Sequence, residues 1–161
     1  MPNIEILKKV KIFDGLVTAE LFQIGSICEE LAFPEYYVIF EEDSSSDELY
    51  ILVKGKVELK LKVPGKDNWM TLTKMHPGDV FGEFALIDQS PRSAAAIAFT
   101  EIMLYIIKRD DFFKLIDDNP RIGSVIMQNL ARLLVERLRA TDSELKNHIV
   151  WQLVEAGEEL D

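Results

Sequence analysis

The feature that most constrains the fold is a series of short apolar segments between Ala32 and Lys108. In them, apolar residues alternate with polar ones or run together, and β-branched and aromatic side chains are frequent; they read YYVIFEE, LYILVKG, KVELKLKV, WMTLTKM, AAAIAF and IMLYII. Glycine, proline, aspartate and asparagine separate them, as in tight turns. Many short strands at this spacing favour a sandwich or jelly roll. We therefore expect an antiparallel β-roll over residues 32–108.

Helical spacing flanks this β region on its N-terminal side. Two short helices are predicted within residues 3–30, the second with Thr18 as its N-cap and an apolar stripe that begins at Leu21. Cys28, the only cysteine, falls in this second helical stretch and is interpreted as a packing side chain. One cysteine cannot form an intramolecular disulfide, which favours a reducing compartment.

The C-terminal part of the roll domain is predicted to be helical over residues 109–149. Asn119-Pro120 fits a helix cap followed by proline at the first helical position. The whole of residues 1–149 is interpreted as one domain, and residues 150–161 as an acidic tail.

The helix predicted from Pro120 carries an apolar seam. Its members are spaced by three or four residues: Ile126, Leu130, Leu134, Leu138, Thr141, Leu145 and Ile149. The seam can pack against the chain's own roll or associate with a second copy as a coiled coil. Because it is longer than one small roll can cover, we expect a homodimer through residues 120–149, with Thr141 as its weak point.

Charge and composition exclude several classes of function. The formal net charge is −10, which repels nucleic-acid phosphates, so no nucleic-acid partner is expected. The sequence has neither a secretory leader nor an apolar run of membrane-spanning length, so we expect a cytoplasmic protein without a membrane partner. The two histidines are far apart and no acid–base constellation is evident. We therefore expect no metal, no cofactor and no catalytic activity.

The segment FGEFALIDQSPRSAAAIA, residues 81–98, contains the parts of a small phosphate-ester site. Gly82 permits close approach of the backbone, and the following FALI segment can form a single helical turn with free N–H groups. Arg92 presents a planar fork of donors that suits phosphate oxygens, and Ser93 adds a hydroxyl. The carboxylate of Glu83 can accept from a sugar hydroxyl. Two plainer interpretations stay open: Arg92 can be a structural arginine paired with an acid, and Glu83 can cap a turn.

The order of these motifs resembles that of cyclic-nucleotide-binding domains. Gly82-Glu83-Phe84-Ala85-Leu86 followed by Pro91-Arg92-Ser93-Ala94 is similar to the family's phosphate-binding cassette. The segments KKVKIFDGL, VIFEE, LYILVKGKVEL, PGDVFGE and IMLYIIKRDDF also follow the family's order, as does the long helix that begins with NP. The resemblance covers roughly residues 5–145.

The resemblance implies an eight-stranded β-roll, mainly β with flanking helices, that binds cyclic AMP or, as a weaker candidate, cyclic GMP. It implies that the backbone of Phe84 and Ala85 and the side chains of Arg92 and Ser93 bind the cyclic phosphate. Glu83 would hold the ribose 2′-hydroxyl, and the long helix would serve as lid, dimer seam or both. The family's base-contacting positions on that helix align loosely with Arg137 and Leu138.

Two departures from the family pattern leave other functions open. The segment before LYIL, which is usually rich in glycine, reads Asp43-Ser44-Ser45-Ser46-Asp47, and Ala95 stands where threonine or serine is common. Because of these departures, a ligand-free protein-interaction domain of the same fold stays an alternative function. A sensor fragment of a transcription regulator is the other alternative, although the residues after Ile149 are too few for a helix-turn-helix. A sensor without an output domain would act on an effector protein, unidentified from the sequence.

Overall fold

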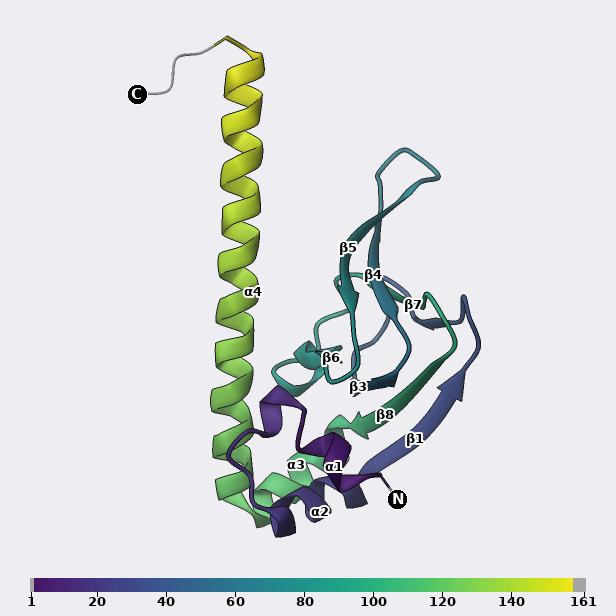
Figure 1. Cartoon of the computed structure of the whole chain (residues 1–161), viewed down its shortest axis with the longest axis vertical. Helices are drawn as coiled ribbons and strands as arrows, with labels where there is room; N and C mark the ends of the chain where they lie inside the picture. Colours follow the sequence, from purple (N-terminus) through teal and green to yellow (C-terminus); the bar gives the residue numbers. More distant parts are fainter. Residues whose placement is uncertain (1, 158–161) are drawn as a thin grey trace.

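The computed structural model describes residues 2–157, and Figure 1 shows their arrangement. Eight strands form two four-stranded antiparallel sheets, which confirms the predicted roll. The first sheet has the order β1 (Cys28–Phe33), β8 (Ile102–Lys108), β3 (Glu48–Lys54) and β6 (Val80–Phe81). The second has the order β2 (Val38–Phe40), β7 (Ala95–Ala98), β4 (Val57–Lys62) and β5 (Trp69–Met75).

Strand β3 explains how the roll and the helices share one core. Its alternate residues Tyr50 and Leu52 point between the two sheets, where they pack with the inner faces of β4 and β7. Leu49 and Ile51 point to the opposite side and pack under the helices. A strand that is buried on both faces reads as a continuous apolar run, which accounts for LYILV in the sequence.

Short helices cover the outer face of the first sheet. They are α1 (Ile4–Leu7), the 3-10 turn η1 (Lys11–Phe13), α2 (Thr18–Ser26) and α3 (Arg109–Asp118). The prediction of helix up to residue 30 is wrong, because the chain leaves α2 at Ser26 and enters β1 at Cys28. Pairing of all six β1 residues with β8 stabilises the extended conformation there, and this long-range contact leaves no local mark in the sequence.

Two smaller details of this region also differ from expectation. The N-cap of α2 is Val17 rather than Thr18, and the Glu20 carboxylate accepts from the Val17 N–H at 2.9 Å. Cys28 lies in a strand rather than a helix, where burial raises the pKa of its thiol to about 12. A thiol with so high a pKa is a poor nucleophile, in keeping with a packing role.

The long helix α4 (Pro120–Glu155) begins among the short helices and continues past the roll (Figure 1). Its first half buries Ile122, Ile126 and Leu130 in the core. Its second half leaves Leu138, Leu145 and Ile149 exposed. The predicted seam therefore divides into a buried and an exposed part.

Helix α4 also runs further than predicted. Residues 150–155, expected to belong to an acidic tail, form its last turns, and residues 158–161 lie outside the described part of the chain. The division into one domain and a tail stays a prediction. Within residues 2–157, no helix combines the length and the apolar character needed to cross a membrane.

Candidate ligand-binding site

The site begins at Gly82, which connects β6 to the short 3-10 turn η2 (Glu83–Leu86). Gly82 has a φ of 71°, in the left-handed region that other residues rarely adopt. A β-carbon at this position would lie 2.7 Å from Arg92 Nη1 and 3.1 Å from the Glu48 carbonyl oxygen. The glycine is therefore required both by the turn and by the close approach of Arg92. Ala85 and Leu86 are buried and anchor the turn against the core.

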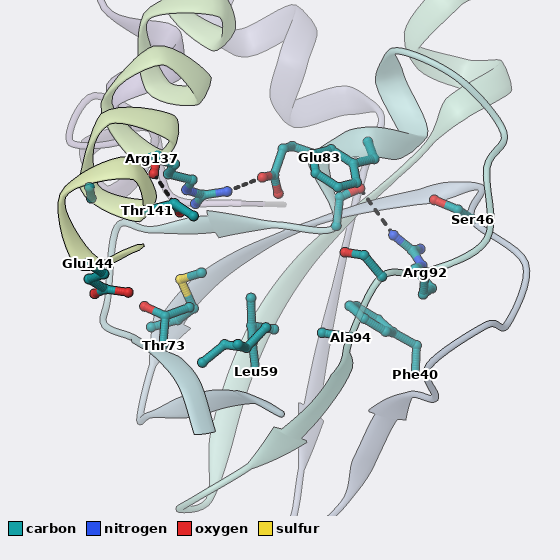
Figure 2. A pocket seen from close by; sticks show the side chains of 16 residues that line it. Phe40, Ser46, Leu59, Thr73, Glu83, Arg92, Ala94, Arg137, Thr141 and Glu144 are labelled. Carbon is teal, nitrogen blue, oxygen red and sulfur yellow. Dashed lines mark hydrogen bonds and ion pairs between the residues drawn. The ribbon is translucent and has the colours of Figure 1, made fainter. Parts of the chain in front are cut away.

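A cavity of about 430 Å³ lies between this turn, the second sheet and α4. Its volume is in the range of small-molecule sites. Figure 2 shows the side chains that line it. They come from the segment 82–94, from β4 and β5, from α4 and from two further positions: Gly82, Glu83, Phe84, Arg92, Ser93, Ala94; Leu59, Leu72, Thr73, Met75; Arg137, Ala140, Thr141, Glu144; Phe40 and Ser46.

Arg92 is a buried cation at one end of this cavity. Its side chain is almost fully enclosed, with 5% of the residue exposed. Nη1 donates to the Gly82 carbonyl at 3.1 Å and Nη2 to the Glu48 carbonyl at 2.9 Å. The guanidinium also lies over the Phe40 ring, 4.3 Å from its centroid. Its Nε is buried and has no hydrogen-bond partner in the described structure.

No carboxylate among the described residues forms an ion pair with Arg92. Burial lowers the pKa of the Arg92 guanidinium, and nearby acidic groups partly offset this effect. A buried charge is costly unless it is paired. Carbonyl dipoles and an aromatic ring compensate only in part, so the position suits an anionic group brought in by a ligand.

Glu83 connects the cassette turn to the long helix. Its carboxylate is buried and forms an ion pair with Arg137 of α4 (Figure 2). Arg137 also donates from Nη2 to the Val80 carbonyl at 2.8 Å. Through Arg137, the long helix α4 is therefore joined both to Val80, where β6 begins, and to Glu83, where η2 begins.

The structure brings together most of the predicted site residues. Gly82, Glu83, Phe84, Arg92 and Ser93 all line the cavity, and so does Arg137. Two predicted residues are placed differently, namely Ala85 and Leu138. The N–H of Ala85, a residue that does not line the cavity, donates to the Gly82 carbonyl at 3.2 Å. Leu138 is 61% exposed on another face of α4.

Sequence reasoning missed four polar residues that also line the cavity. Thr141 and Glu144 share a helix face with Arg137, since they follow it by four and seven residues. That spacing could have identified them, and it also shows that Thr141 faces the cavity rather than the exposed seam. The alternation of side chains along β5 could have placed Thr73 on the cavity side, but nothing in the sequence indicated that Ser46 lines the cavity.

The lining of the cavity is both polar and apolar. Arg92 and Ser93 provide a cation and a hydroxyl at one end, whereas Leu59, Leu72 and Met75 of β4 and β5 add apolar side chains to the lining. Figure 2 shows Thr73 and Thr141 away from Arg92. The arrangement suits a ligand with an anionic group on one side and a flat apolar group on the other. Among residues 2–157, no cluster of three or more histidine, cysteine or acidic side chains could hold a metal ion.

Comparison with known proteins decides the family. Residues 30–119 match the family model described as the cyclic nucleotide-binding domain. The chain belongs to this family. Cyclic nucleotide-binding domains are typically regulatory modules rather than catalysts.

Individual members of the family are similar over most of the chain. The CRP-like cAMP-activated global transcriptional regulator of Mycobacterium tuberculosis is 33% identical over 146 residues, which cover 90% of this chain and 62% of the relative. A cyclic nucleotide-binding domain from Methylobacillus flagellatus has a TM-score of 0.79 at 26% identity and covers 90% of this chain and 81% of its own. The regulatory domain of Toxoplasma gondii PKA, crystallised with cAMP, has a TM-score of 0.71 at 28% identity, with coverages of 83% and 48%. The chain spans less than two thirds of the mycobacterial regulator's length.

Proposed function

We propose that this chain is a sensor module that binds cyclic AMP in the cavity beside Arg92. The observation that carries the proposal is a buried cation without an acidic partner at one end of a cavity that is also lined by apolar side chains of the second sheet. The cyclic phosphate would lie against Arg92, Ser93 and the backbone of Phe84. The base would lie between the apolar side chains of the second sheet and α4. The mycobacterial relative and the Toxoplasma structure, both named with cAMP, support the choice of nucleotide.

Glu83 is proposed to bind the ribose 2′-hydroxyl, and the bound sugar would then share this carboxylate with Arg137. The nucleotide would in this way alter an ion pair that joins the cassette to α4. Thr141, which lies on the same face of α4 as Arg137, would contact the edge of the base. These contacts give α4 different interactions with and without ligand, which a signalling helix requires.

The binding test is isothermal titration calorimetry of the wild-type chain with three nucleotides. Cyclic AMP should bind most tightly, cyclic GMP more weakly, and 5′-AMP weakest because its phosphate is esterified only to O5′ of the ribose and is not closed into a ring through O3′. If the folded wild-type chain gives no heat of binding with any of the three nucleotides, the proposed cyclic-nucleotide binding is contradicted and the alternative of a ligand-free protein-interaction domain is favoured.

The signalling test is hydrogen exchange along α4. With saturating cyclic AMP, the exchange rates of the amides of residues 133–148 should fall by at least about threefold, because the ligand adds contacts to Arg137 and Thr141. Amides of α2, which does not line the cavity, serve as the internal reference. Unchanged exchange throughout residues 120–148 at saturation would contradict a role of α4 in signalling.

The output of the module is proposed to be protein association. A net charge of −10 disfavours direct contact with DNA. The exposed half of α4 is the proposed homodimer seam, and an effector protein would respond to changes in its position.

A further inference from the structure

Ser46 is a buried hydroxyl on the wall of the cavity. The residue is 4% exposed, and its Oγ has no hydrogen-bond partner in the described structure. It lies in the segment Asp43-Ser44-Ser45-Ser46-Asp47, between β2 and β3. Figure 2 shows its oxygen directed towards the side of the cavity that holds the Arg92 guanidinium.

The unsatisfied polar atoms of the described structure concentrate at this place. Three buried side-chain nitrogen or oxygen atoms lack a partner within residues 2–157, and they are Gln23 Oε1, Ser46 Oγ and Arg92 Nε. The last two belong to residues that line the same cavity. Buried polar groups are nearly always hydrogen-bonded, so two unsatisfied donors of residues that line one cavity suit an acceptor supplied by a ligand.

The segment that carries Ser46 is fixed against the cassette. The Arg92 N–H donates to the Ser44 carbonyl, and the Asp43 N–H donates to the Arg92 carbonyl, both at 2.8 Å. At the other end, the Arg109 N–H donates to the Asp47 carbonyl at 2.8 Å. The hydroxyl of Ser46 is therefore positioned by the same backbone that positions Arg92.

The present bonds of Arg92 show which of its donors remain for a ligand. Nη1 and Nη2 each donate one of their two N–H groups to a backbone carbonyl, so one N–H remains on each, and Nε is the nitrogen without any acceptor. An oxygen that accepts from Nε could also accept from a hydroxyl next to it. Phosphate oxygens accept several hydrogen bonds and gain most from a charged donor.

We propose that Ser46 Oγ donates to an exocyclic oxygen of the ligand's cyclic phosphate, alongside Arg92. The inference rests on the proposed function and assigns a phosphate contact to a residue outside the cassette. The serine-rich segment would then add a donor to the site, whereas a glycine at this position would offer no side-chain donor.

The test compares Ser46→Ala with its neighbour Ser45→Ala by calorimetry with cyclic AMP. Ser45 is exposed and does not line the cavity, so its variant should bind within about twofold of the wild type. Ser46→Ala should bind about 10- to 100-fold more weakly, the usual range for a hydrogen bond to a charged group. Melting temperatures without ligand show whether either variant is destabilised.

The two phosphorothioate diastereomers of cyclic AMP locate the contact. Each replaces one exocyclic oxygen by sulfur, which is a weaker hydrogen-bond acceptor. The Ser46→Ala penalty should persist with one diastereomer and largely disappear with the other.

Three results would overturn the inference. If the wild type binds and Ser46→Ala binds equally well, the hydroxyl makes no contact and the proposed function stands. If the penalty is the same for cyclic AMP and both diastereomers, Ser46 only holds the segment in place. If the wild type binds no cyclic nucleotide at all, the proposed function fails and this contact fails with it.

Discussion

Replacing Arg92 with methionine is expected to weaken cyclic AMP binding by about 10- to 100-fold. The substitution removes every donor of the guanidinium, which lies over the Phe40 and Tyr50 rings, and puts an unbranched apolar side chain in its place. Charge-assisted hydrogen bonds to phosphate contribute about 1.5–3 kcal/mol, which corresponds to this loss. Calorimetry measures the affinity, and the melting temperature of the ligand-free variant shows whether the fold is retained.

A matched control is needed because Arg92 also supports the cassette. It donates to the Gly82 and Glu48 carbonyls, so its loss can loosen the turn. Arg109 supports the same turn by donating to the Ala85 carbonyl at 2.6 Å, yet it does not line the cavity. Arg109→Met should therefore bind cyclic AMP within about threefold of the wild type. Wild-type affinity in a folded Arg92→Met variant would show that the cation does not hold the ligand.

The double substitution Leu138→Glu and Leu145→Glu is expected to convert a homodimer into a monomer. Val135, Leu138, Leu145 and Ile149 are exposed and separated by three, seven and four residues, as at the a and d positions of a heptad repeat. Burying each leucine in a dimer contributes about 1.5–3 kcal/mol, and the double variant alters four side chains per dimer. Added carboxylates also repel each other across the seam. Dimer affinity should fall by at least about 1,000-fold.

Light scattering coupled to size exclusion measures this change. The wild type should have twice the mass of one 18.4-kDa chain, and the double variant the mass of one. Asn147 is exposed and lies about half a turn away from Leu138 and Leu145, so Asn147→Glu should remain dimeric. A wild-type chain that is monomeric at 100 μM, on the order of typical assay concentrations, would contradict the proposed seam.

The elements that could be predicted from the sequence are those with a strong local pattern. Strand β3 has a continuous apolar run, and α4 has a cap followed by a long stretch without proline. The N-terminal strand β1 has no such pattern, because CEELAF combines acidic and apolar residues at helix-like spacing. Its conformation depends on pairing with β8, which begins 74 positions later along the chain at Ile102.

The candidate site shows the same division between local and long-range information. Gly82, Glu83, Arg92 and Ser93 occur in one short segment with an identifiable chemistry, and the cavity contains all four. The contacts from α4 were predicted less accurately. A loose alignment suggested Leu138 as a base contact, whereas Thr141 is the residue that lines the cavity. The ion pair between Glu83 and Arg137 joins residues 54 positions apart, and only the packing of α4 brings them together.

Calorimetric titration of the wild-type chain with cyclic AMP tests the central claim most directly. We expect saturable binding of one nucleotide per chain with a dissociation constant of about 10 μM or tighter, a range that a single charge-assisted phosphate site with an apolar base pocket supports. A folded chain that gives no heat of binding with cyclic AMP at about 1 mM, far above that constant, would contradict the claim that the cavity beside Arg92 is a nucleotide site.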